Sequence, residues 1–334
     1  MQNSFSQTVR SFFSPILEYI DSPEISEIMI NSHSEIWVES GGKVLKTETC
    51  FESQEALMSA VNNIAQFVKR RIDEETPTMD ARLPDGSRIH VVLPPCSQKG
   101  ICISIRKFKK ALTLEKLLDY ESITEDAIEF IRQAIIQKRN ILVSGGTGSG
   151  KTSLLNALTS LVPNEERIIV IEDSSELKLQ QDHVVYLETK EPDRHGKGKV
   201  SIRDLLRSTL RLRPDRIIVG EIRGEEAIDF LQAMNTGHGG SMGTLHANSP
   251  LDALYRLETL TLFSGIAIPL TAIRAQVASS IDLIVQTTRY RNGARKISYI
   301  SEVKSLQSDI SYELSNLFLY NKKTDTLDCI SKEI

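Results

Sequence analysis

The sequence predicts an α/β protein in which a P-loop domain with a mainly parallel sheet follows a smaller α+β domain. Three observations support this prediction. Apolar strands alternate with helices from residue 124 on, a Gly-rich turn with Gly-Lys-Thr follows one of these strands, and short strands joined by turns fill the first hundred residues. A chain of 334 residues also exceeds one ordinary domain. We expect domains at 1–106 and 114–334, joined by a linker at 107–113.

The first domain contains apolar patterns with the period of a helix and others with the period of a strand. Apolar residues at helical spacing predict two helices, and alternating residues between turn signals predict the strands of a small sheet. Ser40-Gly41-Gly42 and Pro84-Asp85-Gly86 are the turn signals. The expected helices are Ser6–Ile20 and Glu52–Lys69, and the expected strands are Glu27–Ile30, Glu35–Glu39, Lys43–Lys46, Met79–Leu83, Arg88–Leu93 and Ile101–Arg106.

The linker at 107–113 overlaps a basic run, Arg106-Lys107-Phe108-Lys109-Lys110, which leads into a helical stretch from Thr113. One interpretation is a solvated connection without further function. The other is a hinge whose charge also matters for anionic ligands.

The second domain alternates strands and helices, the arrangement of βαβ units in a parallel sheet. Runs such as Ile-Ile-Val-Ile are typical of strands buried on both faces. The expected helices are Thr124–Gln137, Lys151–Leu161, Ser201–Leu212 and Glu225–Asn235, and the expected strands are Asn140–Val143, Arg167–Ile171, Arg216–Val219 and Gly240–Leu245.

Composition narrows the class of protein. The chain is 40% hydrophobic and 25% charged, which argues against wholesale disorder, and its net charge of −4 lacks the basic excess of a nucleic-acid binder. We find neither an apolar run of the roughly 18–20 residues that span a membrane nor a signal peptide. The four cysteines show no CxxC spacing, so we expect neither a zinc site nor disulfides, and place the protein in the reducing cytoplasm.

A phosphate-binding loop is the strongest local signal. Eight residues match G-x-x-x-x-G-K-[ST], between an apolar strand and a helix. Glycines let successive N–H groups face phosphate oxygens, and the helix adds its positive end. We expect the lysine on the β- and γ-phosphates and the threonine hydroxyl on Mg²⁺. The predicted ATP site comprises Gly145, Gly146, Thr147, Gly148, Ser149, Gly150, Lys151 and Thr152.

Acidic residues follow two of the expected strands. Glu172 and Asp173 follow one, and Glu221 follows the other. Ligands of parallel sheets lie beyond the carboxyl ends of strands, so these acids should face the phosphates. Glu221 stands where a Walker B acid is expected and is the candidate base for the attacking water. Either Glu172 or Glu221 would hold Mg²⁺ through water together with Thr152. A helix cap or a surface role is the alternative for each acid.

Two histidines, His238 and His246, flank the strand Gly240–Leu245. Without a third ligand nearby, a metal pair is not indicated. Structural histidines are one interpretation. Beside a P-loop we expect both to sense the γ-phosphate, as donors to it or to the attacking water.

These blocks, taken together with Arg213-Pro214-Asp215-Arg216-Ile217-Ile218-Val219-Gly220-Glu221-Ile222-Arg223-Gly224, resemble the secretion ATPases of type II secretion, type IV secretion and type IV pili. The resemblance covers roughly residues 25 to 305. The segments 180–185, 187–189 and 233–238 resemble the CpaF branch, which powers assembly of Tad-type pili. Two further segments, Arg71-Ile72-Asp73 and residues 80–88, also resemble the CpaF branch.

The resemblance implies a RecA-like motor domain, an N-terminal domain packed over the nucleotide, and a ring-shaped homohexamer. It implies ATP with Mg²⁺, and peripheral work at the cytoplasmic face of the inner membrane on platform proteins. Arg88 and Arg106 match family arginines that reach the phosphates, as bidentate guanidinium groups can. Without the resemblance both would be ordinary surface residues. Arg207 and Arg211 match family arginines of uncertain role, with a subunit border as one interpretation.

Several functions remain open. The four-cysteine metal module of the type II and pilus-extension branches is absent from the sequence, which disfavours those branches. An ATPase for effector or DNA export by type IV secretion is the alternative within the family. A RecA-type nucleic-acid motor and a nucleotide-gated scaffold with little turnover are further alternatives. The net charge of −4 argues against direct nucleic-acid binding.

Overall fold

The computed structural model describes residues 10–83, 86–107, 112–190, 192, 196–304, 306 and 311–331. The chain forms two compact units, residues 1–110 and 111–334, each with its own hydrophobic core. The unit boundary therefore falls directly after the basic run, within the predicted linker 107–113.

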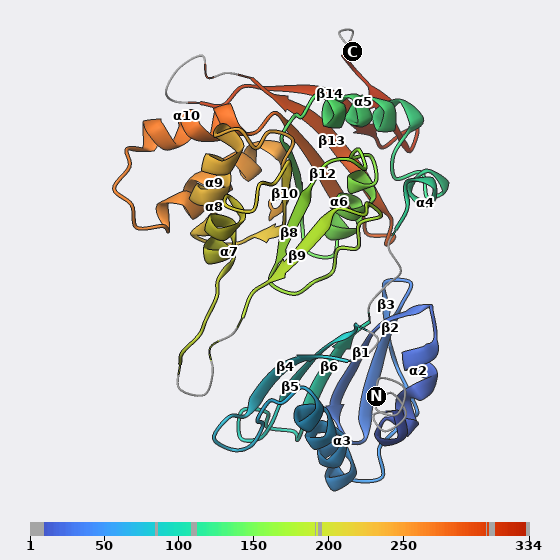
Figure 1. Ribbon diagram of the computed structural model, residues 1–334. Helices are drawn as coiled ribbons and strands as arrows, with labels where there is room; N and C mark the ends of the chain where they lie inside the picture. Colours follow the sequence, from blue (N-terminus) through green and yellow to red (C-terminus); the bar gives the residue numbers. More distant parts are fainter. Residues whose placement is uncertain are drawn as a thin grey trace. The chain divides into compact units, whose positions relative to one another are not determined.

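The N-terminal unit is a six-stranded antiparallel sheet in the order β3-β2-β1-β6-β5-β4, with α3 packed against it (Figure 1). The Ser53 side chain accepts the Ala56 N–H and begins α3, whose residues Leu57, Val61 and Ile64 are buried in the core. The strands are β1 (Ile25–Ser32), β2 (Glu35–Ser40), β3 (Lys43–Lys46), β4 (Thr78–Arg82), β5 (Arg88–Val92) and β6 (Cys102–Arg106), and α3 is Gln54–Phe67.

The expected helix Ser6–Ile20 is interrupted in the structure. Residues 10–12 are helical, and the chain then continues as the 3₁₀ helix η1 (Ser14–Ile16) and the α-helix α2 (Leu17–Asp21). Pro15 is the physical reason, because proline lacks an N–H and fits only the first turn of a helix. Residues 6–9 of that prediction, and Pro84-Asp85 of the predicted turn, lie outside the described residues.

The C-terminal unit is a nine-stranded sheet in the order β15-β14-β13-β12-β7-β11-β10-β8-β9. The six strands from β12 to β9 in this order are parallel to one another, and β13, β14 and β15 continue the sheet in antiparallel fashion. The strands are β7 (Ile141–Gly145), β8 (Ile168–Glu172), β9 (Val184–Glu188), β10 (Arg216–Ile222), β11 (Met242–His246), β12 (Leu283–Arg289), β13 (Arg295–Val303), β14 (Leu314–Asn321) and β15 (Thr326–Cys329).

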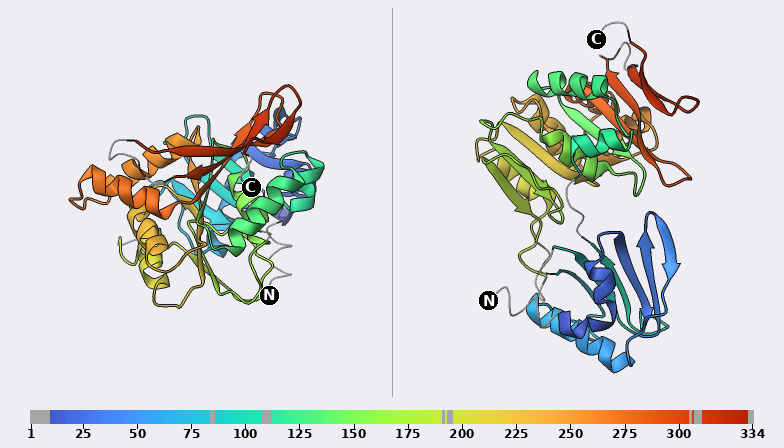
Figure 2. Two further views of the ribbon diagram at one scale, coloured as in Figure 1. Left: turned by 90° about the horizontal axis from the view of Figure 1, so that it is seen from above. Right: turned by 90° about the vertical axis from the view of Figure 1, so that its right-hand side faces the viewer.

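Helices cover both faces of this sheet (Figures 1 and 2). Helices α5 and α6 bury their apolar residues against one face, and α7 to α10 pack on the other. Every residue of β7 and β8 is buried, as expected for strands covered on both sides. The helices are α4 (Leu114–Asp119), α5 (Glu125–Ile136), α6 (Lys151–Thr159), α7 (Ile202–Thr209), α8 (Glu226–Asn235), α9 (Pro250–Leu262) and α10 (Leu270–Ser280).

The predicted fold class is confirmed: an α/β unit with a mainly parallel sheet follows a smaller α+β unit. Two predicted boundaries are wrong by three residues: α7 ends at Thr209 and not at Leu212, and β10 continues past Val219 to Ile222. Arg213 adopts a positive φ of 54° and Pro214 follows it, so the chain leaves the helix before the next strand. None of the helices in the described segments is long and apolar enough to cross a membrane.

Candidate nucleotide-binding site

The P-loop connects β7 to α6. Gly148 and Gly150 have positive φ angles of 68° and 96°, which residues with a side chain rarely adopt, and these two glycines turn the chain back over the end of the strand. Gly150 is the N-cap of α6 and has no side chain to bond the first N–H groups of the helix. These groups, with the positive end of the helix dipole, form an anion site of the kind that binds phosphate.

Contacts to β12 fix the base of the loop. The Ser149 hydroxyl donates to Gly146 O at 2.9 Å and shares a hydrogen bond of 2.7 Å with the Thr287 hydroxyl. Thr287 in turn donates to Ser144 O at 3.2 Å. A Cβ on Gly145 would lie 2.3 Å from Thr287 Oγ1, so this glycine is required by close packing.

Lys151 lies across the mouth of the loop. Its side chain is only 7% exposed, and its Nζ is 3.0 Å from Gly146 O and 3.2 Å from His246 Nδ1. His246 is the last residue of β11 and pairs with Gly145 in the parallel register, which places it at the carboxyl end of the strands. The structure therefore brings two predicted site residues together within one unit.

Glu221 completes this cluster from β10. Its Oε1 lies 3.1 Å from His246 Nε2, and its Oε2 accepts from Arg223 Nη2 at 2.6 Å. Arg223 also reaches Asp173 Oδ2 at 3.2 Å. The Glu221 side chain is 20% exposed, so a water molecule can approach its carboxylate.

The charges in this cluster set its protonation. Burial alone would raise the pKa of Glu221, but the nearby Arg223, His246 and Lys151 together hold that pKa below its usual value. Burial, followed by the charge of Lys151, lowers the pKa of His246. At neutral pH the cluster therefore combines an ionised carboxylate, a neutral imidazole and two cations.

Glu172 lies close by, but its carboxylate is already engaged. It is 4% exposed, and its Oε1 accepts the N–H groups of Glu176 and Leu177 at 2.9 and 3.1 Å. A Cβ on Gly220 would lie 2.7 Å from Glu172 Cγ, so β10 passes directly beside it. Glu172 thus holds the loop after β8, whereas Glu221 has the more accessible carboxylate.

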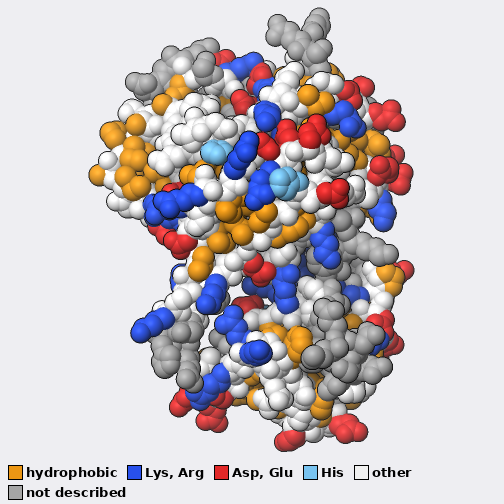
Figure 3. Space-filling view, in the orientation of Figure 1, with side chains coloured by type: hydrophobic (Ala, Val, Ile, Leu, Met, Phe, Trp, Pro, Cys, Tyr) orange, Lys and Arg blue, Asp and Glu red, His pale blue; other side chains and the backbone are white. Residues whose placement is uncertain are grey.

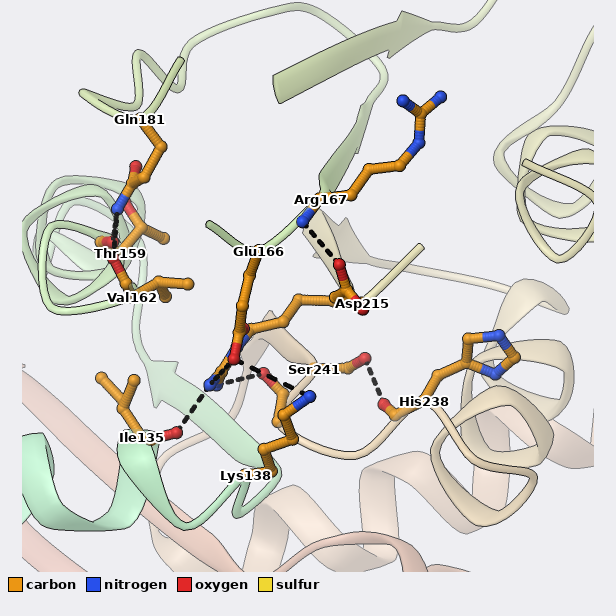
Figure 4. A network of polar contacts seen from close by, with 12 residues as sticks. Ile135, Lys138, Thr159, Val162, Glu166, Arg167, Gln181, Asp215, His238 and Ser241 are labelled. Atoms are coloured by element: carbon orange, nitrogen blue, oxygen red, sulfur yellow. Dashed lines mark hydrogen bonds and ion pairs between the residues drawn. The ribbon is translucent and has the colours of Figure 1, made fainter. Parts of the chain in front are cut away.

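The structure separates the two histidines. Met242, the first residue of β11, pairs with Ile141 at the amino end of β7, and His238 precedes β11. Four strand steps of about 3.3 Å, roughly 13 Å in all, separate Met242 from His246. His238 lies beside a buried polar network, and its main-chain carbonyl accepts from Ser241 Oγ (Figure 4). The structure therefore does not bring His238 and His246 together within one chain, and a contact of His238 with the γ-phosphate stays a prediction.

The predicted arginines fall into two groups. In the N-terminal unit Arg88 pairs with Arg106 across β5 and β6, and with Arg82 across β4 and β5. Directly paired residues share one face of a sheet, so three like charges stand in a row, with Arg88 also 3.3 Å from Asp80. In the other unit Arg207 of α7 bonds Asp229 of α8 at 2.8 Å.

Arg211 follows the end of α7 in a turn. Arg207 is therefore a residue of α7, and Arg211 is not. Their role at a subunit border stays a prediction.

Comparisons with known proteins give the family. The model of the "Type II/IV secretion system protein" family matches residues 11–311. The chain belongs to this family. A putative conjugal transfer protein of Mycobacterium tuberculosis is 32% identical over 292 residues, which is 85% of this chain and 82% of the relative. A type IV secretion system protein PtlH homologue of Bordetella bronchiseptica is 34% identical over 304 residues, with coverages of 83% and 90%.

A solved structure supports the fold assignment. The pilus retraction motor PilT with bound ADP matches with a TM-score of 0.61, 20% identity, and coverage of 92% of this chain and 82% of that one. At this identity the likeness concerns the fold. The predicted membership of the type II/type IV secretion ATPases is confirmed by the family match.

Sequence reasoning gave no role to several residues of the site. Arg223 lies only two residues beyond Glu221, and that spacing was the available signal. Arg289 and Arg295, from β12 and β13, meet the P-loop at Gly148, a contact that no local pattern indicates. Among the described residues no group of three His, Cys, Asp or Glu side chains is arranged to hold a metal ion.

Proposed function

We propose that the protein is an ATPase motor, in which Glu221 activates water and the P-loop holds the phosphates. The observation that carries the proposal is the contiguous set Lys151, His246, Glu221 and Arg223 at the mouth of the loop. Family membership supports the same activity. A nucleotide-gated scaffold would not require an accessible ionised carboxylate at this position.

Each residue has a distinct task in this proposal. The N–H groups of the loop and Lys151 bind the phosphates and neutralise charge as it develops. Glu221 accepts the proton of the attacking water, while Arg223 and His246 orient its carboxylate. Mg²⁺, bound through the Thr152 hydroxyl and through water to Glu172 or Glu221, would neutralise phosphate oxygens. Thr152 is half-buried in the first turn of α6, an accessible position that suits this role.

We propose further that the motor works as a homohexamer at the cytoplasmic face of the inner membrane, on platform proteins. The segments that resemble the CpaF branch lead us to propose that the motor powers assembly of a Tad-type pilus. Arg88 and Arg106, with Arg82 in the same row, supply guanidinium groups to the phosphates. His238 stays a candidate for a neighbouring subunit's nucleotide, because it lies at the opposite end of β11 from His246.

Export by type IV secretion is the second candidate. The name of the conjugal transfer relative favours it, and so does that of the PtlH homologue. A motor that acts directly on nucleic acid is less well supported, because the displayed face of the C-terminal unit carries both acidic and basic side chains (Figure 3). Stimulation of hydrolysis by single-stranded DNA would favour that reading.

Lys151→Ala tests the proposal. The substitution removes the cation at the point where negative charge develops, so phosphate release from ATP should fall to background while the circular dichroism spectrum is unchanged. Hydrolysis near the wild-type rate would show that this loop is not the working site.

A further inference from the structure

Two consecutive residues of β12, Gln286 and Thr287, point to opposite faces of the sheet near the P-loop. The Thr287 hydroxyl bonds the Ser149 hydroxyl of the loop at 2.7 Å. Gln286 shares its face with Ile284, which belongs to the core beneath α7 to α10. The register of β12 against β13 shifts between the two residues, and such irregularities redirect side chains beside active sites. Gln286 thus approaches the site from the face opposite to α6.

The Gln286 amide reaches the chain directly after His246. Its Nε2 donates to Ala247 O at 3.1 Å. Strand β7 lies between β12 and β11, so the Gln286 side chain crosses β7 to reach this carbonyl. The β7 residue that pairs with Gln286 is Ser144, whose small side chain leaves room for the crossing. The hydrogen bond therefore links β12 to the end of β11 across an intervening strand.

This bond lies where the chain leaves the sheet. His246 is the last residue of β11, and the chain turns from there toward α9. From this position the His246 ring makes its contacts with the site, 3.2 Å to Lys151 Nζ and 3.1 Å to Glu221 Oε1. The direction of the ring depends on the path of the main chain on both sides of it, and Gln286 fixes the side beyond the strand.

Stability alone does not account for an amide at this position. Gln286 is 1% exposed, and its Oε1 has no hydrogen-bond partner among the described residues. A buried acceptor without a partner costs at least as much folding free energy as one ordinary hydrogen bond contributes. An apolar side chain of the same length would bury a similar area without that cost. What the amide adds over such a side chain is the Nε2 donor to Ala247 O.

We propose that Gln286 is a positioning residue for hydrolysis, whose amide holds the main chain at Ala247 and thereby keeps the His246 ring against the Glu221 carboxylate. The inference rests on the proposed function. Gln286 acts through His246 and not on the nucleotide. A displacement of about 1 Å at a reacting group can cost up to about 10²-fold in rate, so loss of this bond should lower kcat and leave nucleotide affinity unchanged.

Gln286→Met tests the inference, because methionine preserves the length of the side chain and removes the donor. We expect kcat for ATP hydrolysis to fall about tenfold. The affinity for ADP in calorimetric titration should stay unchanged, and the urea midpoint should stay the same or rise.

Gln181→Met is the matched control. Gln181 is also buried, donates from Nε2 to Thr159 O at 2.7 Å and has an Oε1 without a partner among the described residues. Thr159 is the last residue of α6, at the opposite end of this helix from the P-loop. The control should therefore leave kcat unchanged.

A double-mutant cycle with His246→Ala shows whether the amide acts through the histidine. In the His246→Ala protein, Gln286→Met should lower kcat no further, because the group that it positions is absent. An equal fold loss in the presence and in the absence of His246 would overturn the inference. A loss of ADP affinity or of stability in Gln286→Met that parallels the loss of kcat would also overturn it.

The remaining outcomes separate this inference from the proposed function. Inactive Lys151→Ala together with a wild-type kcat in Gln286→Met would overturn the positioning role alone. Wild-type protein without hydrolysis would overturn the ATPase proposal itself. If Gln286→Met does not fold, Gln286→Leu carries the same expectations, and failure of both variants to fold would show that the amide is structural and overturn the inference.

Discussion

At the scale of single residues, the carboxylates of Glu172 and Glu221 differ in what they already bind. Glu172 is buried and accepts two main-chain N–H groups, whereas Glu221 pairs with the side chains of Arg223 and His246 and is partly open to solvent. A base must exchange a proton with water, so accessibility favours Glu221 for that role.

Glu221→Gln should therefore bind ATP and retain it. The amide preserves the shape of the side chain but removes the base, so turnover should fall by about 10²-fold or more. Single-turnover measurements of bound ATP and released phosphate check this. Glu172→Gln is the matched control, and a trapped ATP state in that variant would mean that the two acids have exchanged roles.

Arg223 should control the pH dependence of hydrolysis. Burial alone would raise the pKa of Glu221, but Arg223 helps to hold that pKa below its usual value. The carboxylate therefore stays ionised as the pH falls from 7 to 5. Arg223→Gln removes the opposing cation, which should raise the pKa of Glu221 and move the acidic limb of kcat/KM to higher pH. An acidic limb at the same pH in both proteins would contradict this electrostatic role.

At the scale of elements, a buried ion pair joins the amino ends of the central strands. Arg216 of β10 is fully buried and bonds Glu166, Ile135 O at 2.7 Å and Gly240 O at 3.1 Å (Figure 4). Lys138 lies 3.7 Å from the same glutamate. The network connects α5, β10 and the segment before β11, at the opposite end of the strands from the P-loop.

Glu166→Ala should lower the free energy of unfolding by about 3 kcal/mol, because it leaves a buried guanidinium without its counter-charge. The neighbouring exposed Glu165→Ala is the matched control and should change stability by less than about 0.5 kcal/mol. Urea titration measures both. The folded Glu166→Ala protein should bind ADP as the wild type does. Equal losses of stability in the two variants would contradict a stabilising role of the Arg216–Glu166 ion pair.

At the scale of the whole molecule, the proposed function takes the charges for one phosphate group from two units. Arg88 and Arg106 belong to the N-terminal unit, and Lys151 belongs to the C-terminal unit. We propose that ATP closes the units about the linker 107–113 and that phosphate release opens them, because the γ-phosphate supplies contacts that ADP lacks.

Mixed hexamers test which chain the arginines serve. The short linker leads us to expect service within one chain, so a mixture of Lys151→Ala subunits and Arg88→Ala/Arg106→Ala subunits should be inactive. Each variant mixed with wild type is the control for assembly. Recovered ATPase activity in the double-mutant mixture would instead place the arginines across a subunit border.

The sequence by itself determined the elements whose signals are local. The P-loop, the apolar strands β7, β8 and β10, and the acids at the carboxyl ends of β8 and β10 have patterns within about ten residues. The reason is that each of these strands is buried on both faces, and in parallel sheets the carboxyl ends of strands form the ligand edge. It did not predict β9, a half-exposed edge strand, or the four strands after residue 280.

Only the tertiary structure decided which chemical groups meet. Parallel pairing placed His246 beside Lys151 and Glu221 and placed His238 at the far end of the strands. The added strands β12 and β13 brought Arg295 to Gly148, across a separation of 147 residues. Such contacts depend on strand order and register, which long-range packing fixes and short-range patterns do not encode.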